Sequence, residues 1–360
     1  MLSIGIVGLP NVGKSTLFNA LIKQKAAAAA NYPFCTIEPN VGIVEVPDER
    51  LNRLADVFHP KKIVPTVIEF VDIAGLVAGA SKGEGLGNQF LSHIRNVDAI
   101  LQVVRIFKDE NVTHVDGSVD PQRDLEVINT ELILADLQTL EKRMNSVEKA
   151  AKSGDKQLQA KLNLYQRLQK ALDEGKLAHS IEISEEEKPY IKELCLLTSK
   201  PFLYALNIDE PVATAGGVRE SRLLGVNPDQ QIPFCAKLEE DLNDLSDADR
   251  TAYLSDLGVK ETGLDRLITK GYEALNLITF LTAGEPEVRA WTVRKDARAP
   301  EAAGVIHSDF QEKFIKAEAI SWHLLVENGG WSGAREKGLV RIEGKEYVVQ
   351  DGDTMYFRHG

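Results

Sequence analysis

The segment GLPNVGKS at residues 8–15 matches the pattern G-x-x-x-x-G-K-[ST] in full, and it constrains the fold more than any other part of the chain. An apolar run at residues 2–7 predicts a strand before this segment, and apolar residues at helical spacing over 15–22 predict a helix after it. A strand, a glycine-rich loop and a helix in this order are the context in which such a loop binds phosphates. The sequence therefore predicts an α/β domain built around a nucleotide site.

The residue types in this segment suit phosphate and metal binding. Gly8 and Gly13 let the backbone turn so that its amides converge on phosphate oxygens. Lys14 supplies a mobile positive charge for the outer phosphates, and the Ser15 hydroxyl is suited to ligate Mg²⁺. We therefore expect Mg²⁺ as the cofactor.

Composition narrows the class of protein. The 360 residues carry a net charge of −12, which argues against a uniformly basic nucleic-acid binder but allows a local basic patch. No apolar run approaches the roughly 20 residues that span a bilayer, so we expect no membrane anchor. Cys35, Cys195 and Cys235 lie far apart and form no metal-ligand pair, which favours a reduced, cytoplasmic setting.

Two further segments have the features of phosphate-sensing switches. Residues 31–40 (NYPFCTIEPN) contain two prolines and little periodicity, so we expect a loop in which Thr36 reaches Mg²⁺ and the outer phosphate. Residues 72–75 (DIAG) follow an apolar run that predicts a strand. Here Asp72 would hold the metal through water, and the Gly75 amide would contact the terminal phosphate.

The sequence lacks the residues with which GTPases read guanine. After an apolar strand, GTPases have N-K-x-D, whereas residues 207–210 of this chain are NIDE. Asn207, Ile208 and Glu210 are therefore candidates for an altered base-binding end, although a buried carboxylate matches adenine poorly and Glu210 could turn away. Ala236 lies in the segment CAK, which occupies the position of a second base-binding loop.

A helical insertion interrupts the nucleotide-binding sequence. From residue 125 onward, apolar residues step alternately by four and by three, which is a heptad seam. Gly154 and Asp155 separate this seam from a second apolar stripe over residues 158–172. These patterns predict an antiparallel helical hairpin. After residue 277 the pattern changes to short strand-like runs, which predict a small α+β domain.

We therefore expect three domains. A discontinuous P-loop domain with a mostly parallel sheet would span residues 1–124 and 200–276. The helical hairpin, a coiled coil, would span 125–199, and the C-terminal domain 277–360.

The chain resembles the YchF/Obg-like ATPases, a branch of the translation-factor-related P-loop GTPases. The resemblance covers essentially the whole chain and includes the inserted hairpin. The C-terminal segments LITFLTAG and HSDFQEKF are similar to that family's TGS domain, a ubiquitin-like β-grasp. The other segments that carry it are GLPNVGKST at 8–16, NYPFCTIEPN at 31–40, DIAGLVAGASKGEGLGNQFL at 72–91 and NIDE at 207–210.

The resemblance implies a slow, Mg²⁺-dependent ATPase that prefers ATP to GTP and whose nucleotide state controls docking to the ribosome and RNA. The large ribosomal subunit is the expected partner, and the chain is expected to be a monomer. Ser15 and Thr36 would serve Mg²⁺, and Asn207 with the backbone of Ile208 would contact the base. The phosphate contacts fall on Asn11, Val12, Gly13, Lys14, Ser15 and Thr16.

Residues 142–170 contain eight Lys and Arg residues against two acids and would surround the tip of the hairpin. We predict that this basic run contacts RNA or the ribosome, and a solvated helix face is the alternative. The lysines chosen to represent the run are Lys149, Lys152, Lys156 and Lys161.

The group that activates water is not evident from the motifs. Many GTPases have a glutamine at the position of Leu76, and leucine cannot orient water. His114 follows a strand expected at 98–107, and the carboxyl ends of such strands face the nucleotide. We predict that His114 positions the water when its loop closes, and an ordinary loop histidine is the alternative.

Two other functions are compatible with these residues. A true GTPase of the same architecture differs only at residues 207–210. A nucleotide-stabilised RNA-binding scaffold with negligible turnover is favoured by Leu76. A P-loop kinase fits less well, because the DIAG segment and Thr36 suit a switch.

Overall fold

The computed structural model describes residues 2–25, 40–73, 86–109, 111–114, 117–151, 155–210, 223–243, 245–256 and 261–360. The chain divides into two compact units. The first is built mainly from Met1–Gln24 and Glu69–Leu267, and the second mainly from Ile43–Ile68 and Ile268–Gly360. The domain boundaries expected from the sequence place residues 43–68 with the P-loop domain, and those boundaries stay a prediction.

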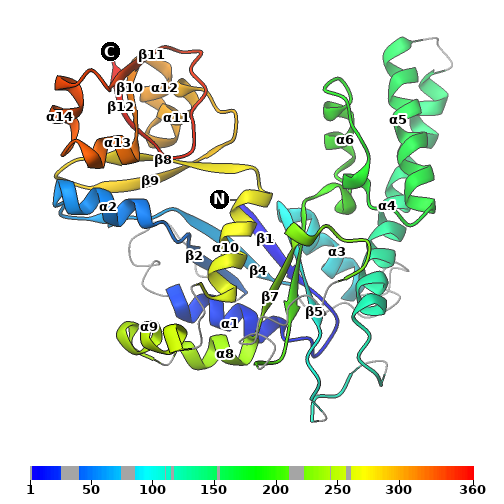
Figure 1. The fold of residues 1–360 in the computed structure, drawn as a ribbon. Helices are drawn as coiled ribbons and strands as arrows, with labels where there is room; N and C mark the ends of the chain where they lie inside the picture. Colours follow the sequence, from blue (N-terminus) through cyan, green and yellow to red (C-terminus); the bar gives the residue numbers. More distant parts are fainter. Residues whose placement is uncertain are drawn as a thin grey trace. The chain divides into compact units, whose positions relative to one another are not determined.

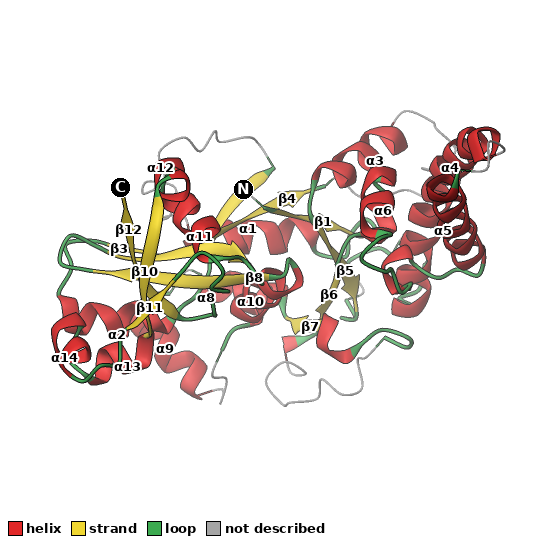
Figure 2. Ribbon diagram, turned by 90° about the horizontal axis from the view of Figure 1, so that it is seen from above, coloured by secondary structure: helices red, strands yellow, loops and turns green. Residues whose placement is uncertain are grey.

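A six-stranded sheet carries the P-loop motif (Figures 1 and 2). Strand β1 pairs in parallel with β4 and β5, and β6 pairs in parallel with β5 and β7. This confirms the predicted P-loop domain with a mostly parallel sheet. In spatial order the strands are β2 (Val41–Glu45), β4 (Val67–Asp72), β1 (Ser3–Val7), β5 (Ala99–Arg105), β6 (Phe202–Asn207) and β7 (Gln231–Phe234).

The central strands β1, β5 and β6 are buried along their whole length. Parallel strands covered on both faces read as continuous apolar runs, which is why the sequence predicted them clearly. The helices that follow or flank these strands are α1 (Lys14–Lys25), α3 (Leu86–Asn96), α8 (Ala236–Leu242), α9 (Asp247–Asp256) and α10 (Gly263–Ala274). A short 3₁₀ turn, Pro228–Gln230, precedes β7.

The predicted helical hairpin consists of α4 (Pro121–Ala151) and α5 (Lys156–Asp173), and Asp155 caps the start of α5 through its side chain. The heptad positions pack as expected, because Leu140 lies in one buried cluster with Leu164 and Leu168. A third helix, α6 (Lys188–Leu194), contributes Leu194 to the same cluster.

A buried carboxylate attaches the hairpin to the sheet. Asp136 of α4 accepts hydrogen bonds from the backbone N–H groups of Leu197 and Thr198, both at 2.8 Å, and from the Thr198 hydroxyl at 2.6 Å. These residues form the 3₁₀ turn Leu197–Ser199, directly before β6. A second 3₁₀ turn, Ala178–Ser180, is tied to Thr198 because the Ala178 N–H donates to its hydroxyl.

The second unit contains a mixed six-stranded sheet. Strand β12 pairs in parallel with β8 and antiparallel with β10, and β8 and β9 form an antiparallel hairpin. These pairings confirm the predicted β-grasp domain. In spatial order the strands are β11 (Arg341–Glu343), β10 (Phe314–Ser321), β12 (Asp353–His359), β8 (Leu277–Ala283), β9 (Val288–Arg294) and β3 (Ile63–Val64).

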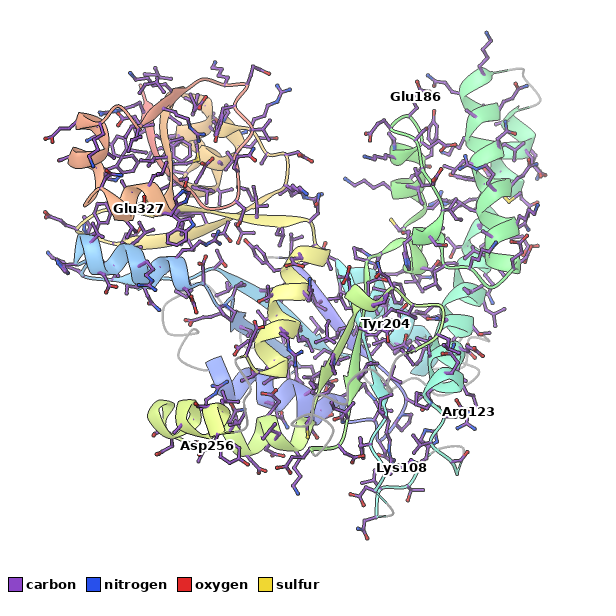
Figure 3. All side chains as sticks on the ribbon, viewed as in Figure 1. Lys108, Arg123, Glu186, Tyr204, Asp256 and Glu327 are labelled. Atoms are coloured by element: carbon purple, nitrogen blue, oxygen red, sulfur yellow. The ribbon has the colours of Figure 1, made fainter. Side chains whose placement is uncertain are left out.

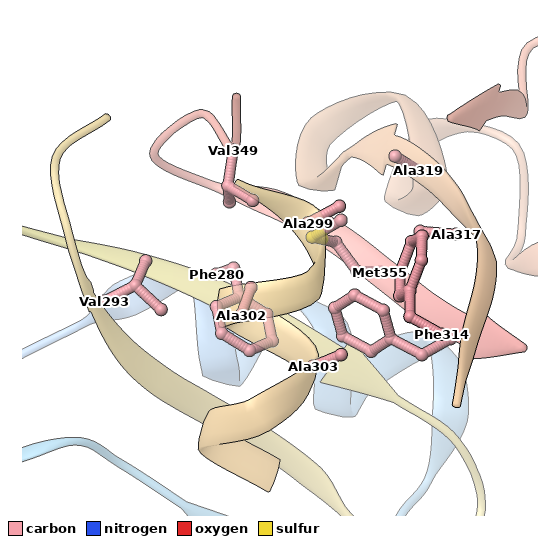
Figure 4. Packing of buried hydrophobic residues seen from close by; sticks show 11 residues of the cluster. Phe280, Val293, Ala299, Ala302, Ala303, Phe314, Ala317, Ala319, Val349 and Met355 are labelled. Carbon is pink, nitrogen blue, oxygen red and sulfur yellow. The ribbon is translucent and has the colours of Figure 1, made fainter. Parts of the chain in front are cut away.

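One core of this unit forms between the sheet and helices α11 (Ala299–Ile306) and α12 (Ser308–Glu312). Figure 4 shows Ala299, Ala302 and Ala303 of α11 turned toward Phe280 and Phe314. Small alanine side chains let this helix approach the aromatic rings closely.

A second core joins distant parts of the sequence. Helix α2 (Glu49–Phe58) contributes Leu51 and Leu54, which are buried with Leu281 and Leu325. Helices α13 (Trp322–Glu327) and α14 (Trp331–Glu336) complete this cluster. Strand β3 also pairs with β9, so α2 and β3 belong to the core and the sheet of the second unit. Among the helices of the described ranges, none is long and apolar enough to cross a bilayer.

Candidate functional site

A pocket of about 610 Å³ lies in the first unit at the carboxyl ends of its parallel strands. One part of its wall is the phosphate loop, and the rest comes from the segments that follow β5, β6 and β7. In open α/β sheets this edge is where ligands bind. The lining residues after these strands are 107–109 and 112, 207–210, and 235–237 with 240.

The phosphate loop has the backbone geometry that its glycines permit. Gly13 has φ of +100°, and a Cβ atom there would lie 2.4 Å from Nδ2 of Asn207. Any larger residue would therefore displace the Asn207 side chain. At Gly8, a Cβ atom would lie 2.7 Å from the carbonyl oxygen of Val103 in β5. The close approach of the loop to its neighbours thus requires glycine at both positions.

The Lys14 side chain is buried within this loop. Its ammonium donates to the carbonyl oxygen of Leu9 at 2.7 Å. Burial lowers the pKa of Lys14, and the charge of Asp72 acts in the opposite direction. The Lys14 ammonium therefore lies inside the phosphate loop. Oxygens of the outer phosphates would compensate there for the water that the ammonium loses on burial.

The side chains of Ser15 and Asp72 meet as a metal site would require. The Ser15 hydroxyl donates to Oδ2 of Asp72 at 3.3 Å, and Oδ1 of Asp72 is buried without a hydrogen-bond partner among the described residues. A hydroxyl and a carboxylate with an unsatisfied oxygen are the hard ligands that Mg²⁺ prefers. These residues fit the predicted cofactor. Thr36 and Gly75 lie outside the described residues, and so does Leu76.

Asn207 connects the phosphate loop to the loop that follows β7. Its Nδ2 donates to the carbonyl oxygen of Val12 at 3.0 Å, and its Oδ1 accepts from the N–H of Ala236 at 3.1 Å. The Ile208 N–H donates to the carbonyl oxygen of Phe234 at 2.9 Å. The predicted base-binding residues therefore hold the loops together, and their role toward a base stays a prediction.

Both acidic and basic side chains line the part of the pocket that is formed by the segments after β6 and β7. Glu210 and Lys237 both line it, together with the buried side chain of Ile208. Asp209 accepts a hydrogen bond from the backbone N–H of Lys108 at 3.4 Å through its Oδ2. This contact ties the end of β6 to the segment after β5.

His114 is buried, and it does not line the pocket. Its Nε2 lies 2.8 Å from Oδ2 of Asp124 in the first turn of α4, and both side chains are almost fully buried. The residue before it is closer to the site, because Asn11 donates through Nδ2 to the carbonyl oxygen of Thr113 at 3.2 Å. Figure 3 labels Lys108 and Arg123, which lie before and after this segment in the chain.

The four basic residues chosen on the hairpin differ in their surroundings. Lys149 and Lys156 are exposed, whereas Lys152 lies outside the described residues. Lys161 is mostly covered and pairs with Glu193 at 2.5 Å. Its ammonium also lies over the ring of Tyr190, 5.7 Å from the ring centre. Lys161 therefore contributes to packing on α6 rather than to an open basic surface.

Sequence reasoning missed two residues near the site. Asp124 holds His114, and Arg105 at the end of β5 is buried among backbone carbonyl groups. A charged residue that ends a largely apolar strand is a signal that could have found Arg105, because a buried charge must be compensated. Asp124 gave no such signal, since an acid in the first turn of a helix is common.

Comparisons with known proteins agree with this architecture. Residues 3–135 match a family described as 50S ribosome-binding GTPases, and residues 277–360 match the C-terminal family of YchF GTPases, described as a protein of unknown function. A Bacillus subtilis protein named "Ribosome-binding ATPase YchF" is 54% identical, with 99% of each chain covered. An Escherichia coli O157:H7 protein of the same name is 50% identical, with 98% of each covered.

A solved structure entitled "Structure of the Schizosaccharomyces pombe YchF GTPase" has a similar fold. It superimposes with a TM-score of 0.88 at 38% sequence identity. The alignment covers 99% of this chain and 97% of that chain.

Proposed function

This chain belongs to the YchF family, and we propose that it is a slow Mg²⁺-dependent ATPase whose nucleotide state controls binding to the ribosome. The observation that carries the proposal is the pocket, which combines a complete phosphate loop with base-binding loops that lack the guanine-reading residues. Relatives named as ribosome-binding ATPases support both parts of the proposal.

In the proposed reaction, Ser15 would ligate Mg²⁺, Asp72 would hold it through water, and Lys14 would bind the outer phosphates. Bound Mg²⁺ neutralises charge on the phosphoryl oxygens. The backbone amides from Asn11 to Thr16 would surround the phosphates, with α1 adding the positive end of its dipole. Thr36 and Gly75 are assigned to the metal and to the terminal phosphate from the motifs alone.

We assign the water-positioning role to His114. A carboxylate that fixes an imidazole is the arrangement used by general bases, and Asp124 holds His114 in this way. The hydrogen bond from Asn11 to the carbonyl oxygen of Thr113 joins the segment that contains His114 to the phosphate loop. Because Leu76 cannot orient water, another residue must take this role.

Preference for ATP is the first test of the proposal. Titration calorimetry with Mg·ATP and Mg·GTP is expected to give tighter binding of ATP by about 10-fold or more, since one well-placed base contact contributes roughly 1–3 kcal/mol. Single-turnover hydrolysis is measured in the same preparation, with and without ribosomes. The variant Glu210→Asp with Ile208→Lys is expected to shift the preference toward GTP.

Two outcomes would replace this proposal. GTP binding at least as tight as ATP binding would favour a GTPase, the name given to the Schizosaccharomyces pombe relative. Hydrolysis that is negligible with and without ribosomes would favour a nucleotide-stabilised scaffold. The proposed partners are the large ribosomal subunit and RNA, and the proposed state is a cytoplasmic monomer.

A further inference from the structure

Arg105 is a buried cation that belongs to none of the predicted motifs. It ends β5, is 1% exposed, and is among the largest fully buried side chains of the described residues. Burying a guanidinium is costly unless its N–H groups are all well paired. Within the described part of the chain, its guanidinium donates hydrogen bonds to backbone carbonyl oxygens of the segment that follows β5.

Three carbonyl oxygens surround this guanidinium. Nε donates to the carbonyl of Phe107 at 3.2 Å, Nη2 to that of Asp109 at 3.1 Å, and Nη1 to that of Val112 at 2.9 Å. The guanidinium carbon also lies 4.3 Å from the centre of the Phe107 ring. The planar fork of arginine suits such a set of fixed acceptors, whereas lysine would present a single nitrogen.

The segment held by Arg105 forms one wall of the nucleotide pocket. Phe107, Asp109 and Val112 line the pocket, and their carbonyl groups are the ones that Arg105 binds. The same segment is joined to the base-binding end of the pocket, because the N–H of Phe107 donates to the carbonyl of Asn207 at 3.0 Å. The Lys108 N–H adds its contact with Asp209.

We propose that Arg105 is a positioning residue for base selection, which holds the wall formed by Phe107, Lys108 and Asp109 against the base-binding end of the pocket. The role rests on the proposed ATPase function. Arg105 acts through the backbone of this wall and does not itself line the pocket. A lost or misplaced wall would weaken contacts to the base and leave the phosphate loop intact.

The variant Arg105→Lys tests this role in the full-length chain. It keeps the charge and removes the planar fork. We expect Mg·ATP to bind about 10-fold more weakly and the ratio of ATP to GTP affinity to fall by a similar factor, as expected when one buried hydrogen-bonding contact is lost. Binding of Mg²⁺ with inorganic tripolyphosphate, which has no base, should change less than about 2-fold.

The control is Arg335→Lys. Arg335 also lies over an aromatic ring, 5.4 Å from the centre of Trp331, and it bonds to Glu318 in the second unit. This variant should leave all three affinities unchanged. If Arg105→Lys weakens tripolyphosphate as much as ATP, Arg105 is a general structural residue and the proposal is wrong. Unchanged affinity for both nucleotides would also overturn it.

A second variant keeps the proposal testable if Arg105→Lys does not fold. Asp209→Ala removes only the carboxylate that accepts from the Lys108 N–H. It should lower the ratio of the affinity for Mg·ATP to the affinity for tripolyphosphate by about 2- to 5-fold. An unchanged ratio would count against the proposal. If the parent chain binds GTP as tightly as ATP, the proposed preference fails, while the advantage over tripolyphosphate still tests Arg105.

Discussion

His114 and Asp124 form a pair that two different roles would explain. Both side chains are almost fully buried and lie 2.8 Å apart, so the pair could serve packing alone. The alternative is that Asp124 orients His114 for catalysis, as in other sites where a carboxylate fixes an imidazole. The second role is attractive because the neighbouring Thr113 contacts Asn11 of the phosphate loop.

Removing the imidazole separates these roles. We expect His114→Ala to lower the single-turnover rate of ATP hydrolysis by roughly 10-fold or more, because proton-handling groups contribute at least this much. The affinity for Mg·ATP should stay nearly intact, since His114 does not line the pocket. Rapid-quench kinetics and calorimetry measure the two quantities.

The matched variant for this test is Asp124→Asn, which keeps the size of the side chain and removes its charge. It should also lower the single-turnover rate, by a smaller factor than His114→Ala does. If both variants hydrolyse ATP at the parent rate with and without ribosomes, the pair is structural, and a group supplied by a partner becomes the better explanation.

At the scale of elements, a buried carboxylate joins α8 to α10. Oε1 of Glu239 accepts from the N–H groups of Gly263 at 2.7 Å and Leu264 at 3.3 Å, while Oε2 has no partner among the described residues. Burial raises the pKa of Glu239 from its ordinary 4.5 to about 7. The two backbone bonds and Arg250 lower this pKa, and Asp265 raises it.

The raised pKa predicts a pH dependence of stability. Between about pH 4.5 and 7 the folded chain holds a proton that the unfolded chain releases, so the contribution of Glu239 to the free energy of unfolding falls as pH rises. Glu239→Gln should reduce this fall by an amount of the order of 2–3 kcal/mol. Denaturant unfolding at pH 5, 7 and 8.5 measures it. Glu240→Gln, an exposed neighbour, is the control and should retain the parent dependence.

The helical hairpin presents only part of its basic run to solvent. Lys149 and Lys156 are exposed, but Lys161 is paired with Glu193. A second basic residue of the run, Arg167, pairs with Glu187 at 2.6 Å. Acidic residues of the return segment therefore offset part of the charge, and an RNA-facing surface would be restricted to the unpaired portion near the tip.

Neutralising the exposed lysines tests that surface. The combined change of Lys149 and Lys156 to glutamine should weaken co-sedimentation with ribosomes and reduce the slope of log affinity against log salt by about 2, one for each lost phosphate contact. Lys161→Gln is the control and should leave ribosome binding unchanged while lowering stability. Binding that is insensitive to the double change would indicate a solvated helix face.

At the scale of the whole molecule, an early segment of the chain completes a late domain. Leu51 and Leu54 of α2 are buried in the core that contains Trp322 and Trp331 at its edge. All three tryptophans of the chain belong to the second unit. Tryptophan fluorescence therefore reports on this unit selectively.

The variant Leu54→Ala should destabilise the C-terminal sheet although it lies more than 200 residues away in sequence. Truncating a fully buried leucine costs about 2–5 kcal/mol, so the unfolding midpoint followed by tryptophan fluorescence should fall. Leu172→Ala, in the buried core of the hairpin, should affect far-UV circular dichroism more than fluorescence. The reverse pattern would contradict the assignment of α2 to the second unit.

The sequence determined the features of this protein that depend on local patterns. The phosphate loop, the DIAG segment and the altered NIDE segment are short motifs, and each could be found without any knowledge of distant contacts. The hairpin was equally evident, because its heptad spacing requires one apolar face on each helix. Among the short strand-like runs expected after residue 277, the run at 347–349 does not form a strand. Val348 forms only an isolated bridge with Arg298, and Tyr347 instead bonds to Asp353.

Which distant residues meet depends on the tertiary fold and is not evident from the sequence. Asn207 bonds to Val12 across 195 positions, Arg105 gathers the carbonyl groups of its loop, and α2 packs into the C-terminal core. Such contacts depend on where the sheets place their strand ends and faces. A local pattern of residue types does not reveal these contacts. An asparagine or an arginine is the same letter in a sequence whether its side chain is solvated or buried.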